Sequence, residues 1–274
     1  HNFIALLILY IANYVFPFLT IPYLSRLLTV EHYGLILYSF AFTLYFNIRC
    51  EYGFNLMGVK EVVLVRKNKE KLNNLLSAIT TVKLLLFVLS IICVLIIVFC
   101  VPKFAKYWYI YCISMFSLLN TVLFPTWFFR GMEKMKYLTF VGVLTKTLSV
   151  ILILSFVRHD SQFYFIPVIN TSIAIIGGLM AQFILFRDFK VRYVVPKLTE
   201  VTEQFQKSWS IFISNIAVSF YSAANSFFLG ILSTPLAVAY YVAAEKLILA
   251  CSDGIGVLSQ VVFPDLIKQV SDNL

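Results

Sequence analysis

The stretch LLLFVLSIICVLIIVFCV, residues 84–101, is 18 residues long and contains no charged side chain. Two further uncharged runs, residues 107–129 and 166–186, have 23 and 21 residues. An α-helix needs about 20 apolar residues to cross roughly 30 Å of bilayer hydrocarbon. Strands of a membrane barrel are shorter and alternate polar with apolar positions, which these runs do not. The sequence therefore predicts an all-α membrane protein, a polytopic helical bundle.

The composition of the whole chain agrees with membrane insertion. Of its 274 residues, 61% are hydrophobic and 13% are charged, whereas about a quarter of a soluble domain is charged. The net charge of +9 could indicate nucleic-acid binding. Most basic residues, however, lie in short stretches between apolar runs, where they orient a membrane protein. We expect no nucleic-acid partner, and we interpret the five cysteines as packing residues because their spacing fits neither a metal site nor a disulfide framework.

Turn signals divide the apolar sequence into eight expected spans. These are residues 3–25, 35–58, 78–101, 107–129, 138–157, 162–186, 209–232 and 236–258. The segment Ser233-Thr234-Pro235 supplies the turn between the last two. The chain opens directly on a span and without an initiator methionine, so we expect further residues before His1.

The polar segment 187–208 divides the chain into two parts. Residues 1–186 form a complete six-helix unit, and residues 209–274 hold the first two helices of a second unit. An even number of spans predicts that the second unit repeats the first in parallel orientation. We therefore expect eight transmembrane helices out of a total of twelve, in two six-helix bundles, and a chain that is part of a longer protein.

The count of Lys and Arg in alternate loops predicts the orientation of the bundle. The loops at 59–77, 130–137 and 187–208 carry 13 basic residues, and the loops on the other side carry four. Basic loops stay in the cytoplasm. We therefore expect these three loops and both chain ends to be cytoplasmic.

Three charged residues fall near the middle of predicted spans. Lys146 lies in the fifth span, and Glu245 and Lys246 lie side by side in the eighth. Each such charge costs about 2.5–3.5 kcal/mol on insertion scales. Because snorkelling to an interface is difficult from mid-span, we expect Lys146 and at least one of the adjacent pair to face a polar cavity.

Charges nearer to a span end have two interpretations. Arg49 and Glu51 lie two residues apart in the cytoplasmic half of the second span, so they face different sides of the helix. They either line the cavity, or Arg49 snorkels and Glu51 makes an inter-helix contact. Lys83 is close to the start of the third span, and we expect it to snorkel.

Amide and hydroxyl side chains collect in the first and seventh spans. Asn13 shares the first span with Pro17 and Pro22, which free backbone carbonyls that need other partners. Asn215 and Asn225 lie in the seventh span with several serines. Ordinary inter-helix hydrogen bonding, worth about 0.6 kcal/mol on average, is the alternative. Polar faces in the first, second, seventh and eighth spans together predict one water-accessible cavity between the two units.

Sequence motifs of common enzyme classes are missing from the chain. It has no phosphate-binding loop GxxxxGK[ST], no zinc-binding HExxH and no nucleophile elbow GxSxG. His1, His32 and His159 lie in terminal or loop positions with no carboxylate arrangement around them. We therefore expect no catalytic residues, no metal and no cofactor, and a protein that is not an enzyme.

Five segments carry a resemblance to a known family. They are NYVFPFLTIPYLSRLLTVEHYG at 13–34, EYGFNL at 51–56, PTWFFRGMEKM at 125–135, FISN at 212–215 and VAYYVAAEKL at 238–247. In order and position they resemble bacterial O-antigen flippases, the Wzx-type polysaccharide transporters of the multidrug/oligosaccharidyl-lipid/polysaccharide exporter superfamily. The resemblance implies two six-helix bundles around a central cavity. It also implies transport of an undecaprenyl-diphosphate-linked oligosaccharide from the cytoplasmic to the outer leaflet of the bacterial inner membrane.

This implied substrate gives roles to the polar residues of the spans. The candidates for the diphosphate are Arg49, Lys146 and Lys246, with Arg26 at the outer end of the first span. Asn13, Asn215 and Asn225 are candidates for the sugars, while the lipid tail stays among the membrane lipids. The family resemblance also implies alternating access, an ion gradient with Glu51 or Glu245 as carrier, and partner proteins such as a polymerase and a chain-length regulator.

Two other functions remain open at this point. An ion-coupled drug or small-molecule exporter of the same superfamily would need acidic and aromatic groups in its cavity rather than several cations. A membrane enzyme of polysaccharide assembly would need a large outer loop, and the outer loops expected here are only a few residues long.

Overall fold

The computed structural model describes residues 2–232, 262–263 and 266 of the chain. Within them the backbone forms eleven α-helices, one short 3-10 helix and no strand. In chain order the elements are α1 (Asn2–Leu27), α2 (Val30–Glu51), α3 (Phe54–Val65), α4 (Lys69–Cys100), α5 (Pro102–Ala105), α6 (Trp108–Phe116), α7 (Leu119–Leu123), α8 (Thr126–Gly131), α9 (Met135–Phe156), η1 (Asp160–Gln162), α10 (Phe165–Arg187) and α11 (Leu198–Leu232). The predicted all-α architecture is confirmed for this part of the chain.

Five helical segments in the described part are long and apolar enough to cross a bilayer. They are Ile4–Leu27, Lys69–Cys100, Trp108–Gly131, Met135–Phe156 and Asp160–Arg187, and they match the first and the third to sixth expected spans. The protein is therefore an integral, polytopic membrane protein. The second and seventh expected spans are helical but not among these five, and residues 236–258 lie outside the described part. The count of eight spans stays a prediction.

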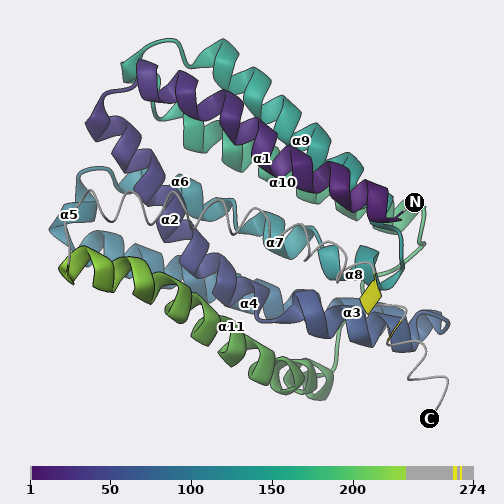
Figure 1. Ribbon diagram of the computed structural model, residues 1–274. Helices are drawn as coiled ribbons and strands as arrows, with labels where there is room; N and C mark the ends of the chain where they lie inside the picture. The colour runs from purple at the N-terminus through teal and green to yellow at the C-terminus, as the bar shows by residue number, and fades with distance from the viewer. Residues whose placement is uncertain (1, 233–261, 264–265, 267–274) are drawn as a thin grey trace.

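The helices form two groups that meet in the middle of the bundle (Figure 1). Helix α9 packs against α1 and α10, α4 packs against α2 and α11, and α6 and α7 contact both α10 and α4. The turns 66–68 and 132–134 and the connection 188–197 meet at one end, here named the basic end after Arg66, Lys67, Lys134, Lys190, Arg192 and Lys197. Residues 28–29 and 157–164 lie at the opposite end.

Helices α1 and α9 lie side by side and run in the same direction. The Thr139 hydroxyl donates to the Ala5 carbonyl, and the Tyr23 hydroxyl donates to the Val157 carbonyl over 2.6 Å. Both hydrogen bonds join residues that are 134 positions apart. The register between the two helices is therefore the same near both of their ends.

The fourth expected span is interrupted twice, between α6 and α7 and between α7 and α8. Pro125 explains the second break, because proline has no backbone N–H and its ring clashes with the carbonyl four residues earlier. That carbonyl belongs to Thr121, and it needs a donor other than a helical N–H. A lysine of α4 supplies this donor, as described below.

The second expected span is also divided, at the join between α2 and α3. Tyr52 and Gly53 have φ angles of 47° and 78°, the left-handed conformation that often ends a helix. A Cβ on Gly53 would lie 2.8 Å from the Ile211 side chain. The Tyr52 ring stacks on Phe205 and Phe212 of α11, with centroids 4.4 and 4.5 Å apart. The break thus provides the surface on which α11 packs.

Helices α3 and α8 approach each other closely through two glycines. A Cβ on Gly58 would lie 2.8 Å from the Trp127 ring, and a Cβ on Gly131 would lie 2.6 Å from the Val62 side chain. Small residues of this kind let membrane helices come into direct backbone contact. They also bring the end of α8 against α3.

We expect Gly58→Ala to lower the free energy of unfolding of the intact protein by about 1–3 kcal/mol, the usual cost of overpacking. The added methyl group would overlap the buried Trp127 ring. Gly34→Ala is the matched control, because Gly34 is also helical and no atom lies within 4 Å of an added Cβ. The two variants are compared by thermal unfolding in detergent micelles, and equal melting temperatures would argue against the close contact.

Candidate functional site

Lys83 is a buried charge near the middle of α4, with 1% of its surface exposed. Its Nζ donates to Oε1 of Glu51 and to the carbonyl oxygen of Thr121, both over 3.2 Å. The ammonium is thus met by a carboxylate and by a backbone acceptor, as a buried charge requires. The Thr121 carbonyl is the one that Pro125 leaves without a helical N–H. The Lys83 ammonium therefore gains an acceptor, and the Thr121 carbonyl gains a donor.

The expectation that Lys83 snorkels to an interface is wrong. Helix α4 begins at Lys69 and is capped by Asn68, whose side chain accepts from the Lys71 backbone N–H. The expected span began nine residues later, at residue 78. At about 1.5 Å per residue, the true start puts Lys83 roughly 20 Å along the helix, and its side chain is held inside the bundle with 1% of its surface exposed.

Two further hydrogen bonds join neighbouring helices, one between α7 and α2 and one between α8 and α3. The Thr121 hydroxyl donates to Oδ1 of Asn47 over 2.6 Å, and the Thr126 hydroxyl donates to Oδ1 of Asn55 over 2.7 Å. Side-chain hydrogen bonds between membrane helices hold them in register. Because Asn55 accepts through Oδ1, its amide Nδ2 group remains a donor, for which no acceptor is found among the described residues.

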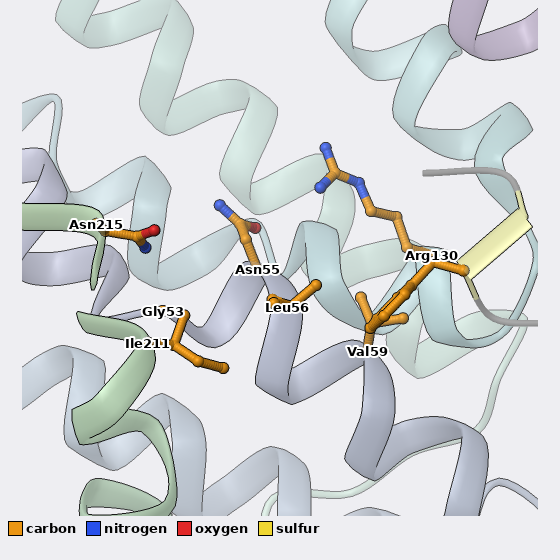
Figure 2. Close-up of a pocket in the computed structure, with 8 residues that line it drawn as sticks. Gly53, Asn55, Leu56, Val59, Arg130, Ile211 and Asn215 are labelled. Atoms are coloured by element: carbon orange, nitrogen blue, oxygen red, sulfur yellow. The ribbon is translucent and has the colours of Figure 1, made fainter. Parts of the chain in front are cut away.

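A pocket of about 270 Å³ lies beside this cluster, near the basic end. Its lining residues are Gly53, Asn55, Leu56, Val59, Arg130, Ile211, Asn215 and Phe263. In Figure 2 the polar ends of Asn55, Arg130 and Asn215 occupy the upper part of the view, and the apolar side chains lie below them. Helices α3, α8 and α11 therefore build a pocket with one polar and one apolar side.

Arg130 brings an incompletely compensated positive charge to this pocket. Its Nε is buried and has no hydrogen-bond partner among the described residues. Glu51 acts on Arg130 electrostatically, but Oε1 of Glu51 is already bonded to Lys83. Lys83, Glu51, Thr121 and Arg130 are here named the inner cluster. Its two cations share one carboxylate, which leaves it with one positive charge in excess among the described residues.

The carboxylates of the basic end have cations of their own. Glu133 pairs with Arg66, and Glu61 pairs with Lys207 over 3.2 Å. Burial lowers the pKa of Lys207, but its acidic neighbours outweigh burial and raise the pKa above its ordinary value. These ion pairs leave the excess charge at Arg130 in place.

Lys146 and Asn13, two of the residues predicted to line a cavity, lie at the same level of the bundle. The constant offset of 134 residues between α1 and α9 places Lys146 opposite residues 12–13. Lys146 is half-buried in the middle of α9 and Asn13 is exposed on α1. Within the described part of the chain, Lys146 has neither a hydrogen bond nor an ion pair.

Arg26 and Arg49 lie apart from that level. Arg26 is exposed in the last turn of α1, at the opposite end of the bundle. Arg49 is half-buried in the last turn of α2, where its Nη1 lies 3.8 Å from Sγ of Cys93 and its guanidinium lies 5.7 Å from the centre of the Phe46 ring. The structure does not bring these two arginines together.

Of the site residues predicted from the sequence, Glu51 lies in the inner cluster and Asn215 lines the pocket. Glu51 makes the inter-helix contact that the sequence offers as one of its two interpretations, and its role in ion coupling stays a prediction. Asn215 is exposed and lines the pocket. The side chain of Asn225 and the whole of Glu245 and Lys246 lie outside the described part.

Three side chains of this region were missed or misread in the sequence. Arg130 belongs to the basic loop 130–137 that the sequence predicts, whereas in the structure it lies in α8, which continues to Gly131. Asn55 falls in the expected second span and in the segment EYGFNL but is not among the expected site residues, and Lys83 lies further from the start of its helix than the sequence predicts. Pro125 was the available signal, because it predicts an unpaired carbonyl at Thr121 and hence a nearby donor.

The opposite end of the bundle is held by a polar contact between distant segments. Oδ2 of Asp160 lies 2.8 Å from Nδ1 of His32, and Oδ1 accepts from the Thr29 backbone N–H over 2.7 Å. The His32 ring also stacks on Phe163, with centroids 4.0 Å apart. The expectation that no carboxylate surrounds the histidines is therefore wrong for His32. Its partner is 128 residues away in the chain, beyond the reach of local pattern analysis.

Comparison with known proteins establishes the family of the chain. Residues 1–269 match the sequence profile described as "Polysaccharide biosynthesis protein". The chain belongs to this family. Membership in the polysaccharide biosynthesis protein family confirms the family resemblance drawn from the five sequence segments.

Two proteins that are similar to this chain are each named "Putative O-antigen transporter". The protein of Escherichia coli (strain K12) is 29% identical over 263 residues, which are 96% of this chain and 63% of the relative. The protein of Shigella dysenteriae is 26% identical over 267 residues, which are 97% of this chain and 67% of the relative. The chain thus spans about two-thirds of the length of these relatives. No solved structure matches it.

Proposed function

We propose that the protein is a flippase for undecaprenyl-diphosphate-linked oligosaccharide repeat units, of O-antigen or a related glycan. In this proposal it lies in the bacterial inner membrane with its basic end in the cytoplasm, and it works by alternating access rather than by catalysis. The name that both relatives carry, "Putative O-antigen transporter", favours this class of substrate.

The observation that carries the proposal is the state of Lys146. Its ammonium stands in the middle of a membrane helix, half-buried and with no acceptor in the described part of the chain. A charge at this depth costs about 2.5–3.5 kcal/mol on insertion scales and marks substrate or ion pathways. A substrate with negative charge would offset this cost each time it passes.

The chemistry of the proposed substrate fits the groups found at membrane depth. A diphosphate needs cations, and we assign Lys146 to it, with Arg49, Lys246 and Arg26 along the route. A sugar chain needs amide and hydroxyl partners, which Asn13, Asn215 and Asn225 offer. The lipid tail needs only the surrounding membrane lipids.

Glu51 argues against a transporter of organic cations. Such a transporter needs a carboxylate free to meet its cargo, whereas Oε1 of Glu51 already accepts from the buried Lys83. Oε2 of Glu51 has no hydrogen-bond partner among the described residues. We retain Glu51 and Glu245 as the candidates for ion coupling.

The proposed architecture extends the described bundle. Residues 1–186 form a six-helix unit, residues 187–208 connect it to the next part, and residues 209–274 begin a second unit. Rocking of the two units about a shared cavity would expose the substrate to each side in turn. A polymerase and a chain-length regulator are the proposed partner proteins in the membrane.

Complementation of a flippase-null bacterial strain with the intact protein tests this proposal. We expect surface glycan to return and the lipid-linked repeat units that accumulate in the null strain to fall to the level of the parent strain. The strain must make a glycan of the type that the protein accepts, so several O-antigen backgrounds are needed. Accumulation that persists in all of them, with the protein present in the membrane, would contradict the proposal.

A further inference from the structure

The inner cluster near the basic end has one more cation than its carboxylate can neutralise. Lys83 uses Oε1 of Glu51 and the Thr121 carbonyl, and the remaining guanidinium is that of Arg130. A buried charge without an opposite charge is costly in a protein interior. Within the described residues, the cluster would therefore be electrically balanced by an anion near Arg130.

The donors around the pocket are arranged to receive such an anion. Arg130 offers a planar guanidinium, which suits the bidentate geometry of a phosphate group. Asn55 presents its Nδ2 amine, because Thr126 already occupies its Oδ1. Asn215 lines the same pocket from α11, and all three polar ends lie on one side of it in Figure 2.

The size of the pocket decides which part of a substrate can enter. Its volume of about 270 Å³ is below the roughly 300–1,000 Å³ of sites for drug-sized ligands. One phosphate or diphosphate group fits within this space, and the sugars of a repeat unit would extend beyond it. The apolar side formed by Leu56, Val59 and Ile211 suits the first carbons of an attached lipid.

We infer that Arg130, Asn55 and Asn215 form a phosphate-binding subsite that receives the diphosphate group of a polyprenyl lipid at the basic end, before the group reaches Lys146. This inference rests on the proposed flippase function and adds the place where the substrate is first bound. The break between α2 and α3 shapes the subsite, and the contact of Gly131 with α3 positions Arg130.

Binding of undecaprenyl diphosphate to the intact protein in phosphatidylcholine nanodiscs tests the subsite. We expect Arg130→Gln to weaken the affinity about 10- to 100-fold, the effect of losing a charged hydrogen bond. Arg130→Lys should lie between this variant and the wild type, because lysine keeps the charge but not the planar fork. Arg187→Gln is the matched control, since Arg187 is an exposed arginine of the same end that does not line the pocket.

A second pair of variants keeps the test valid if Arg130→Gln does not fold. Asn55→Ala and Asn215→Ala alter exposed side chains, and each should weaken binding several-fold, about the effect of one neutral hydrogen bond. Equal affinities of the folded Arg130 or asparagine variants and the Arg187→Gln control would overturn the subsite.

Inorganic pyrophosphate, titrated in parallel, separates the two sources of a phosphate group. Binding of the lipid that depends on Arg130, with weaker binding of free pyrophosphate, supports the assignment to a lipid head group. Binding of pyrophosphate alone would overturn that assignment. If the wild type complements a flippase-null strain while Arg130→Gln binds the lipid normally, the subsite fails and the flippase proposal stands. If lipid binding depends on Arg130 but the wild type does not complement the null strain, the subsite stands and the flippase proposal fails.

Discussion

Lys83→Met is expected to lower the free energy of unfolding of the intact protein by about 3–5 kcal/mol, the usual cost of breaking a buried ion pair from one side. The substitution leaves Glu51 charged in the helix bundle without its Nζ partner. It also leaves the Thr121 carbonyl, already deprived of a helical N–H by Pro125, without a donor from the described part of the chain. Unfolding in mixed detergent micelles measures the loss.

The double variant Lys83→Met with Glu51→Gln separates the ion pair from general damage to the core. Because the double variant leaves no charge of the pair behind, we expect it to be more stable than the sum of the single variants predicts, by about 1–3 kcal/mol. Lys71→Met is the control on the same helix, since Lys71 is exposed in the first turn of α4. Strictly additive effects would mean that Lys83 and Glu51 do not interact.

Lys146→Ala is expected to reduce transport about 10- to 100-fold while membrane insertion stays normal. The estimate corresponds to the loss of one charged contact with a diphosphate. Surface glycan and accumulated lipid-linked repeat units in a complemented null strain measure the effect. Lys246→Ala, in the expected eighth span, should behave in the same way.

Two companion variants make this prediction specific. Lys136→Ala removes an exposed lysine from the first turn of the same helix, α9, and should leave transport unchanged. Lys146→Arg keeps the positive charge and should retain most of the activity. Wild-type glycan levels in both Lys146→Ala and Lys246→Ala would remove the cationic route from the account.

The helical class and most of the spans could be predicted from the sequence, because a membrane imposes both. The uncharged run at 84–101 and its counterparts at 107–129 and 166–186 allow few structures other than helices. The helix boundaries could be predicted less well from the sequence. Helix α4 begins at Lys69, well before the uncharged run, so the sequence places Lys83 closer to a helix end than the structure does.

The inner cluster could not be predicted, because its contacts join residues far apart in the chain. Lys83 meets Glu51 across 32 residues and the Thr121 carbonyl across 38. Pro125 was a local signal for an unpaired carbonyl but carried no information about which donor would reach it. Arg130 could be recognised as part of a pocket only when the contact between α3 and α8 was known.

The central claim is that the protein moves lipid-linked repeat units across a bilayer. The most direct test places the intact, purified protein in vesicles with labelled lipid-linked oligosaccharide in both leaflets and adds a membrane-impermeant enzyme that modifies the glycan. The account predicts that the pool of the inner leaflet becomes modified in vesicles with wild-type protein, and much more slowly with Lys146→Ala. Modification confined to the outer leaflet, as in vesicles without protein, would contradict it.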